Sequence, residues 1–168
     1  MKKSEFFFLA PPVVGNENCG FSVIQIGTDF SEPLTLNLKE WDALHYMKFW
    51  LEELSDVVDG RRDVGLLPTG VCRGPKGMIG FKERWEFKSR RGTFVFRERK
   101  LLGESDPCDS SCRIPEGEWW RLVKDGPAWP ARDCGTKLSV ESNAVLEWCN
   151  KYWFVMNQMR GIDNDDAY

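Results

Sequence analysis

The feature that most constrains the fold is a long helical periodicity flanked by segments that alternate as strands do. Between about Lys39 and Val58, apolar residues recur at the three-then-four spacing that gives a helix one buried side. This buried stripe is predicted to consist of Leu44, Met47, Leu51, Leu54 and Val58. Such a helix between strand patterns predicts an α+β domain, in which helices pack against a mainly antiparallel sheet.

The same helix carries a second group of large side chains. At about 100° per residue, Tyr46 and Phe49 fall on the side opposite the stripe. Four carboxylates share that side, from Asp42, Glu52, Glu53 and Asp56. A solvated acidic face is one interpretation. Aromatic residues among the acids favour another, in which this face contacts a partner protein.

Strand patterns precede the helix. Residues 6–14 and 21–26 read as two strands joined by a turn-rich connection at 15–18. A third short strand, around Leu34 to Leu38, leads into the helix. Asn37 and Glu40 have the spacing of a capping box, which predicts a helix start near Lys39 and an end before Gly60.

Residues 78–102 predict a β-hairpin that turns at Ser89 to Gly92. Its first strand alternates large apolar residues with basic ones, and Glu83 interrupts the apolar side. The return strand places Phe94 and Phe96 on one face and Arg97 on the other. Together these patterns predict about five to seven strands in one sheet, packed against two long helices.

The second long helix is predicted at the carboxyl end of the chain. Ser139 is a suitable cap, Met159 the last periodic residue, and Gly161 the stop. The segment 103–137 is rich in Gly, Pro, Ser and Asp, with one short strand candidate at 119–123. We therefore expect a single domain over 1–162 and a frayed acidic tail at 163–168. The buried stripe of the second helix is predicted to be Val145, Trp148, Cys149, Tyr152, Met156 and Met159.

Charge is segregated along the chain. Residues 1–72 carry 6 basic and 11 acidic side chains, residues 73–100 carry 10 and 3, and residues 101–168 carry 7 and 12. A basic middle between acidic ends argues against a general nucleic-acid-binding protein, whose domain is usually basic overall. Direct nucleic-acid binding through the basic hairpin 78–102 stays open as an alternative function, because basic strands with interleaved aromatics can bind phosphates and stack bases.

The amino terminus resembles an export signal only superficially. Lys2 and Lys3 precede a short apolar run, but Glu5 interrupts it and Pro11 ends it early. No apolar run is long enough to span a membrane. These features predict a cytoplasmic protein with reduced thiols.

Catalytic and metal-binding patterns are weak. His45 is the one histidine, and no nucleophile motif accompanies it. Gly74 to Gly77 lacks the order of a phosphate loop and contains a proline. Cys108 and Cys112 could bind zinc together with Cys72 or Cys134, although free thiols in a loop are the favoured interpretation. The sequence therefore predicts no enzyme activity, no metal and no cofactor.

One joint spacing resembles a known family. Glu32-Pro33-Leu34 is followed by Trp41, Tyr46, Trp50 and Leu54. This order over about 23 residues resembles immunity proteins of bacterial contact-dependent growth inhibition (CDI) systems, part of the polymorphic-toxin group. The amino-terminal strands and the aromatic hairpin are similar to the family layout more loosely.

The resemblance implies a cytoplasmic protein that binds and neutralises one cognate toxin domain, the carboxy-terminal domain of a larger toxin and often a nuclease. It implies no catalysis by the immunity protein. The motif residues are expected to build the scaffold, which leaves specificity to other side chains. Because nuclease toxins tend to carry basic clefts, acidic faces with aromatic anchors are plausible complements. The predicted contact residues are Asp42, Phe49, Glu52, Glu53 and Asp56.

Overall fold

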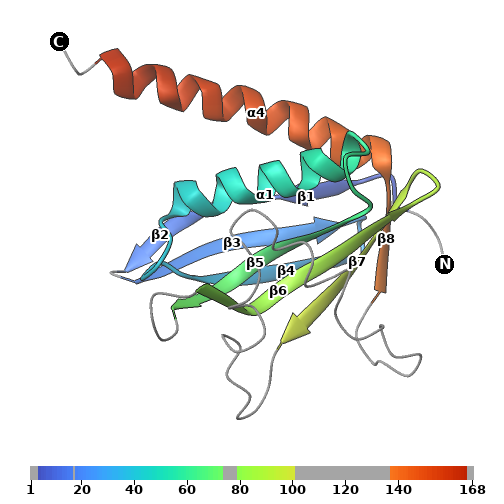
Figure 1. Ribbon diagram of the computed structural model, residues 1–168, viewed down its shortest axis with the longest axis horizontal. Helices are drawn as coiled ribbons and strands as arrows, with labels where there is room; N and C mark the ends of the chain where they lie inside the picture. The colour runs from blue at the N-terminus through green and yellow to red at the C-terminus, as the bar shows by residue number, and fades with distance from the viewer. Residues whose placement is uncertain (1–3, 17, 74–78, 101–136, 166–168) are drawn as a thin grey trace.

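The described part of the chain forms an α+β domain of two four-stranded antiparallel sheets and two long helices (Figure 1). The computed structural model describes residues 4–16, 18–73, 79–100 and 137–165. Its elements, in chain order, are β1 (Phe7–Leu9), β2 (Val13–Asn16), β3 (Cys19–Ile26), β4 (Phe30–Asn37), α1 (Ala43–Val58), β5 (Val64–Arg73), β6 (Ile79–Arg90), β7 (Thr93–Lys100), β8 (Lys137–Glu141) and α4 (Ser142–Asp165).

The first sheet is centred on β3. Strand β4 pairs along one edge of β3, while β1 and β2 pair one after the other along its opposite edge. Between them, the Ala10 amide donates to the carbonyl of Val23 at 2.8 Å, and Ser22 Oγ donates to the Ala10 carbonyl at 2.6 Å. The predicted strand 6–14 is therefore two short strands, separated at Pro11-Pro12, where no amide is free to continue the ladder.

The second sheet has the order β5-β6-β7-β8. The predicted hairpin forms its centre as β6 and β7 and is confirmed. Arg90 pairs with Thr93, so the loop consists of Arg91 and Gly92, which both have positive φ angles of 48° and 76°. Two residues with positive φ form the turn type whose twist matches that of the flanking strands.

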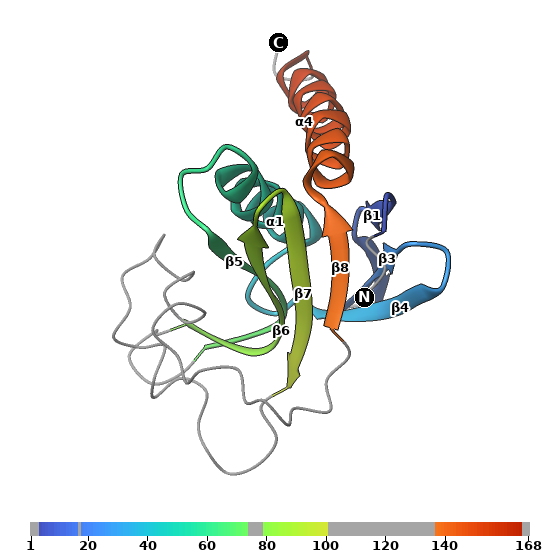
Figure 2. The same cartoon turned by 90° about the vertical axis from the view of Figure 1, so that its right-hand side faces the viewer.

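The two sheets face one another, and the core lies between them. Phe7 of β1 stacks on Phe96 of β7, with ring centroids 5.3 Å apart, and Phe30 of β4 meets Trp85 of β6 edge-on at 5.7 Å. A parallel bridge from Ser4 to Val140 joins the two sheets at one border. Both helices lie along the same side of the paired sheets, and the carboxyl half of α4 extends beyond the strands (Figures 1 and 2).

The fold class predicted from the sequence is confirmed, but the count of five to seven strands in one sheet is wrong. Eight strands in two sheets are present in the described part of the chain. The sequence pattern did not resolve three short strands. It predicts β1 and β2 as one strand and includes most of β8 in the last helix, because three to five residues show too little alternation. The candidate strand 119–123 and most of the segment 103–137 lie outside the described residues.

The predicted start of α1 is also corrected. Asn37 is the last residue of β4, and its side-chain oxygen accepts from the amide of Lys39 without starting a helix. The cap is Asp42, whose Oδ1 accepts a hydrogen bond from the His45 amide at 2.7 Å. An acidic cap of this kind satisfies one of the free amides of the first turn and is favoured by the helix dipole.

Helix α4 begins later and ends later than predicted. Ser139 lies in β8, and the helix continues from Ser142 past Gly161 to Asp165. The expected acidic tail thus begins within α4, and its last residues, 166–168, lie outside the described part. Five predicted stripe positions are buried, namely Val145, Trp148, Cys149, Tyr152 and Met156, whereas the Met159 side chain is outside the described set. Neither helix combines, within the described residues, the length and the apolar character that a membrane span requires.

Candidate partner-binding site

Helix α1 is rotated relative to the prediction from its periodicity. Leu44, predicted to be buried, is 44 % exposed, and Tyr46, predicted to face outward, is fully buried. The buried apolar residues are Tyr46, Met47, Trp50, Leu51, Leu54 and Val57. The side of the helix that faces the core therefore has Tyr46 and Trp50 on one flank and Leu51 and Leu54 on the other.

The inner side of α1 hydrogen-bonds the free edge of β5. Strand β6 occupies one edge of β5, so the backbone groups on the other edge need partners elsewhere. The indole of Trp50 donates to the Pro68 carbonyl at 2.9 Å, and Glu53 Oε2 accepts from the Leu66 amide at 3.0 Å. These bonds explain why a tryptophan and a glutamate share the buried side of a helix.

Tyr46 continues this arrangement towards the end of β4. Its hydroxyl donates to the Asn37 carbonyl at 2.8 Å and accepts, at 3.4 Å, from the Val71 amide. The side chain of Asn37 in turn donates to the Val71 carbonyl at 3.2 Å. Tyr46 and Trp50, two residues of the family-like spacing, therefore hold α1, β4 and β5 together, as expected for scaffold residues.

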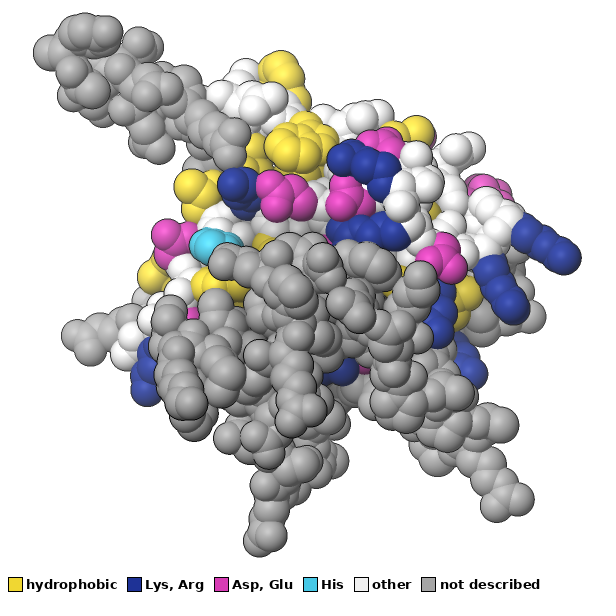
Figure 3. Space-filling view, in the orientation of Figure 1, with side chains coloured by type: hydrophobic (Ala, Val, Ile, Leu, Met, Phe, Trp, Pro, Cys, Tyr) yellow, Lys and Arg dark blue, Asp and Glu magenta, His cyan; other side chains and the backbone are white. Residues whose placement is uncertain are grey.

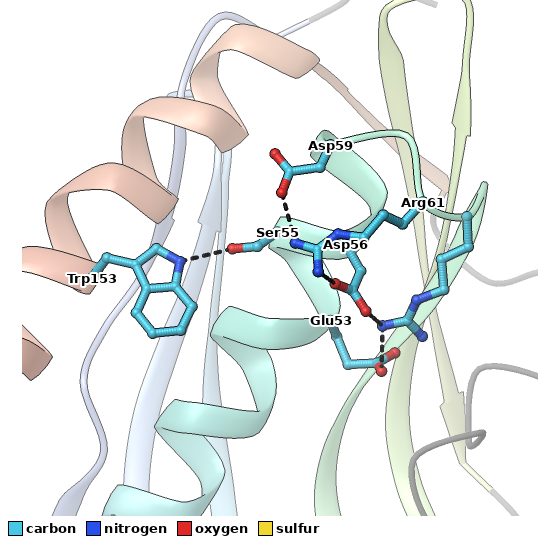
Figure 4. Close-up of polar contacts among 7 residues, drawn as sticks. Glu53, Ser55, Asp56, Asp59, Arg61 and Trp153 are labelled. Atoms are coloured by element: carbon cyan, nitrogen blue, oxygen red, sulfur yellow. Dashed lines mark hydrogen bonds and ion pairs between the residues drawn. The ribbon is translucent and has the colours of Figure 1, made fainter.

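Glu53 is the second correction to the predicted outer face. The residue is 5 % exposed, and its side chain forms an ion pair with Arg62 at 2.8 Å (Figure 4). Burial removes water from the carboxylate and raises its pKa above 4.5, although the hydrogen bond from Arg62 acts in the opposite direction. Glu53 cannot contact a partner directly in this conformation. Its contribution is to fix Arg62, which follows α1 in the chain.

Arg62 connects the buried and exposed parts of the site. Its Nη2 also lies 2.8 Å from Asp56 Oδ2, and Asp56 forms a second ion pair with Arg61 at 2.9 Å. Arg61 reaches Asp59 as well, at 2.7 Å. The carboxylates at the end of α1 are therefore arranged in one network with two arginines, and they do not form an isolated acidic patch.

The remaining predicted contact residues lie on the outer face of α1, which we define as Asp42, His45, Phe49, Glu52 and Asp56. Glu52 is exposed and lies 3.8 Å from Lys48, one turn earlier. Phe49 is half-buried, with its ring 5.0 Å from that of Trp41, which stacks on His45 at 4.4 Å. Figure 3 shows acidic and basic side chains side by side over this part of the surface.

The structure therefore brings four of the five predicted contact residues, Asp42, Phe49, Glu52 and Asp56, onto one exposed helix face. Sequence reasoning missed Lys48, Arg61 and Arg62, which belong to the same surface. The spacing of Lys48 and Glu52, four residues apart on a helix, was a usable signal. The positions of the arginines follow from the path of the chain after α1, which periodicity does not define.

The basic hairpin differs from the open cationic surface that its sequence suggests. Arg84 and Arg97 are buried, and Arg84 Nη2 is paired with the buried Glu86 at 2.9 Å. Arg90 and Arg91, at the turn, are exposed. The side chains of Lys82, Arg99 and Lys100 are outside the described set. At least two of the basic residues that could have contacted phosphates are thus part of the protein interior.

The possible metal ligands Cys108, Cys112 and Cys134 lie outside the described residues, as does the side chain of Cys72. In the described part, Cys19 and Cys149 are free thiols, and no three His, Cys, Asp or Glu side chains are grouped as ligands of a metal would be. His45 is exposed on the outer face of α1 and stacks on Trp41.

A cleft of about 640 Å³ opens between β4 and the second sheet. It is lined by both polar and apolar residues, among them Glu32, Asn37, Thr69, Arg84, Trp85 and Glu98. Asn37 and Val71, which are joined by the hydrogen bond described above, are among its lining residues. None of the predicted contact residues lines it.

Comparison with known proteins gives one informative likeness. No protein-family model matches this chain, and no curated protein matches it by sequence. Among solved structures, the fold matches a chain of the "CdiA-CT/CdiI toxin and immunity complex from Enterobacter cloacae" with a TM-score of 0.61 and 17 % identity. The match covers 91 % of this chain and 99 % of the other chain. At this identity, the comparison shows a shared fold.

Proposed function

We propose that this chain is an immunity protein that binds a cognate CDI-type toxin domain and neutralises it without catalysis. The observation that carries the proposal is the fold match over nearly the whole of both chains to a chain from a toxin–immunity complex. The spacing of Glu32-Pro33-Leu34, Trp41, Tyr46 and Trp50 supports the same assignment from the sequence. The protein would act in the cytoplasm of the bacterium that carries it.

In the proposed mechanism, this protein occludes the active site or the substrate-binding surface of a toxin, which we propose to be a nuclease. The outer face of α1 is the proposed contact surface. Phe49 would supply a half-buried aromatic anchor, and the carboxylates of Asp42, Glu52 and Asp56 would meet cations of the toxin. Glu53 acts through Arg62 and positions Asp56 from within the protein.

The ion pairs on this face change how it would bind. Asp56 shares its charge with Arg61 and Arg62, so a basic toxin surface would have to exchange partners with these arginines. Glu52 is 50 % exposed, and its link to Lys48 is long at 3.8 Å, so it can be redirected at little cost. Phe49 and Glu52 are therefore expected to contribute more to affinity than Asp56.

The experiment that tests the function is co-expression with the toxin domain encoded beside this gene. Cells producing that domain alone should stop growing, and this chain should restore growth and co-purify with the domain in a one-to-one complex. Growth arrest caused by this chain alone would identify it as a toxic component and contradict the proposal. Growth that still stops when this chain is produced together with the toxin domain would also contradict the proposal.

The contact surface is tested separately with Phe49→Ala combined with Glu52→Lys. Hot-spot truncation costs about 2 kcal/mol or more, so the dissociation constant of the complex should rise at least roughly thirty-fold. The matched control is Thr35→Lys, which makes a charge change on the outward side of β4. An unchanged dissociation constant would show that the toxin binds elsewhere, while the proposed function would stand.

A further inference from the structure

The sheet edges of this protein differ in whether their backbone groups have hydrogen-bond partners. The free edge of β5 is hydrogen-bonded by α1, as described above. On β1, the carbonyl of Leu9 accepts from the indole of Trp148 in α4 at 2.9 Å. On β8, Ser4 exchanges backbone hydrogen bonds with Ser139 and Glu141 at 2.9 Å. Along β2, by contrast, no element of the described chain pairs with the edge opposite β3.

Strand β2 is also the most exposed strand, and it is apolar. All four of its residues are exposed, and Val13 and Val14, whose side chains point to opposite faces, are 65 % and 63 % exposed. Phe21, directly across from Val13 on β3, is 50 % exposed. Its ring lies over Gly15 so closely that a Cβ there would be 2.5 Å from Cε2. The glycine thus lets the Phe21 ring lie flat along the strand.

The described positions around this edge carry no formal charge. Strand β2 contains no Lys, Arg, Asp or Glu, and neither do the described outward-facing positions next to it, whereas Glu17, which follows β2 in the chain, lies outside the described residues. On β3 and β4 these positions are Phe21, Val23, Gln25, Ser31, Pro33 and Thr35. Soluble proteins commonly protect a free edge with lysines or other charges, because an uncharged apolar edge invites pairing with another strand. Here the protection consists of Pro11-Pro12, the short length of β2 and the register shift between Val14 and Asn16.

We propose that β2 pairs antiparallel with β2 of a second copy of this chain, across a two-fold axis, to form a weak homodimer. An edge of this composition is self-complementary. The two-fold axis places Val13 and Phe21 of both copies on one face of the joined sheet and Val14 of both copies on the other, without opposing like charges among the described residues. A nucleic acid would need cations, which are absent from this edge. The proposal does not depend on the toxin-binding function.

The dimer is expected to be weak. Four residues per strand form few intermolecular hydrogen bonds, and the adjoining apolar side chains add a contact smaller than a standard interface of about 1,600 Å². A dissociation constant in the range of roughly ten to several hundred micromolar is therefore expected. At the low concentration of a typical binding assay, the protein would be a monomer.

Sedimentation velocity of the full chain, from about 1 µM to about 1 mM, tests the proposal. The wild type should change from monomer to dimer over this range. Val14→Lys should remain a monomer, because it places two like charges near the two-fold axis. Thr28→Lys, with the same added charge on the exposed turn between β3 and β4, at the end of β3 away from β2, should dimerise normally. Circular dichroism checks that Val14→Lys is folded, and hydrogen exchange at Val14 to Asn16 should slow with concentration in the wild type.

Three results would overturn the proposal. They are a wild type that stays monomeric throughout, a Val14→Lys variant that dimerises like the wild type, and exchange at β2 that does not depend on concentration. If Val14→Lys instead loses affinity for the toxin domain while the wild type is monomeric, the edge belongs to the toxin interface and the homodimer is wrong.

Discussion

The two helices cover two sheet edges by different means. Helix α1 uses three side chains, Tyr46, Trp50 and Glu53, against β5 and the end of β4. Helix α4 uses the indole of Trp148 against β1. A second indole, of Trp153, donates to Ser55 Oγ at 3.0 Å and joins the two helices. In both helices, large aromatic side chains with one polar atom combine core volume with hydrogen bonding.

These hydrogen bonds give a structural role to many of the aromatic residues on the two helices. Four of the eight tryptophans, at positions 41, 50, 148 and 153, pack on or along the helices, and three of these donate their indole N–H to a defined acceptor. An excess of aromatic residues on a helix is therefore not by itself evidence of a binding surface. Phe49, which has no polar atom and stays half-buried, is the aromatic residue of α1 best suited to contact a partner.

The largest expected loss of unfolding free energy is at Glu53, and its neighbour Glu52 should show almost none. Glu53→Ala leaves Arg62 with a partly buried charge and the Leu66 amide without its acceptor, so the free energy of unfolding should fall by about 3–5 kcal/mol. Glu52→Ala removes only an exposed pair and should change it by less than about 0.5 kcal/mol. Urea denaturation of both variants makes the comparison. Equal losses would mean that the β5 edge does not depend on Glu53.

The buried Glu53 carboxyl should also make the unfolding free energy depend on pH. Burial raises the pKa of the folded Glu53 carboxyl above 4.5, so the folded state holds this proton more tightly than the unfolded chain does. The stability that protonation of Glu53 provides is complete below the unfolded pKa and is lost as pH rises through the folded pKa. The unfolding free energy of the wild type should therefore fall, relative to that of Glu53→Gln, as pH rises above about 4.5. Parallel curves for the two proteins would contradict this account.

A smaller loss of unfolding free energy is expected when one indole hydrogen bond is removed from either helix. Trp50→Phe and Trp148→Phe each keep a large ring but remove the indole N–H, leaving the buried carbonyl of Pro68 or of Leu9 without that donor. Each should lower the unfolding free energy by about 1–3 kcal/mol. Hydrogen exchange should rise around β5 in the first variant and around β1 in the second. Leu138→Ala, a change in a partly buried core side chain without such a bond, is the control for general loosening.

The sequence predicted the fold class well because the strongest patterns are long. The twelve residues of β6 and the eight of β7 show clear alternation, and the Arg91-Gly92 turn suits a two-residue hairpin. The boundaries of α1 and α4 were less accurate. Asn37 and Ser139 are suitable helix caps by residue type, yet both belong to strands whose pairing depends on distant parts of the chain.

The face of α1 was mispredicted for a physical reason. A periodicity count treats tyrosine and glutamate as polar, and so places Tyr46 and Glu53 outside. In this fold their polar atoms reach backbone groups of a strand edge, which a count of residue types cannot detect. The burial of Glu53 requires Arg62, and Arg62 reaches it because of the turn that ends α1, where Gly60 has a φ angle of 72°.

A hydrogen-exchange footprint of this chain, free and bound to its cognate toxin domain, tests whether the outer face of α1 receives the toxin. Binding should slow exchange along α1 and the following segment, residues 43–63, which carry the outer face and the two arginines. Exchange along β2, at 13–16, should not change at a concentration where the free protein is a monomer. Protection centred on β2 and β3, with exchange along α1 unchanged, would show that the toxin does not bind the outer face of α1.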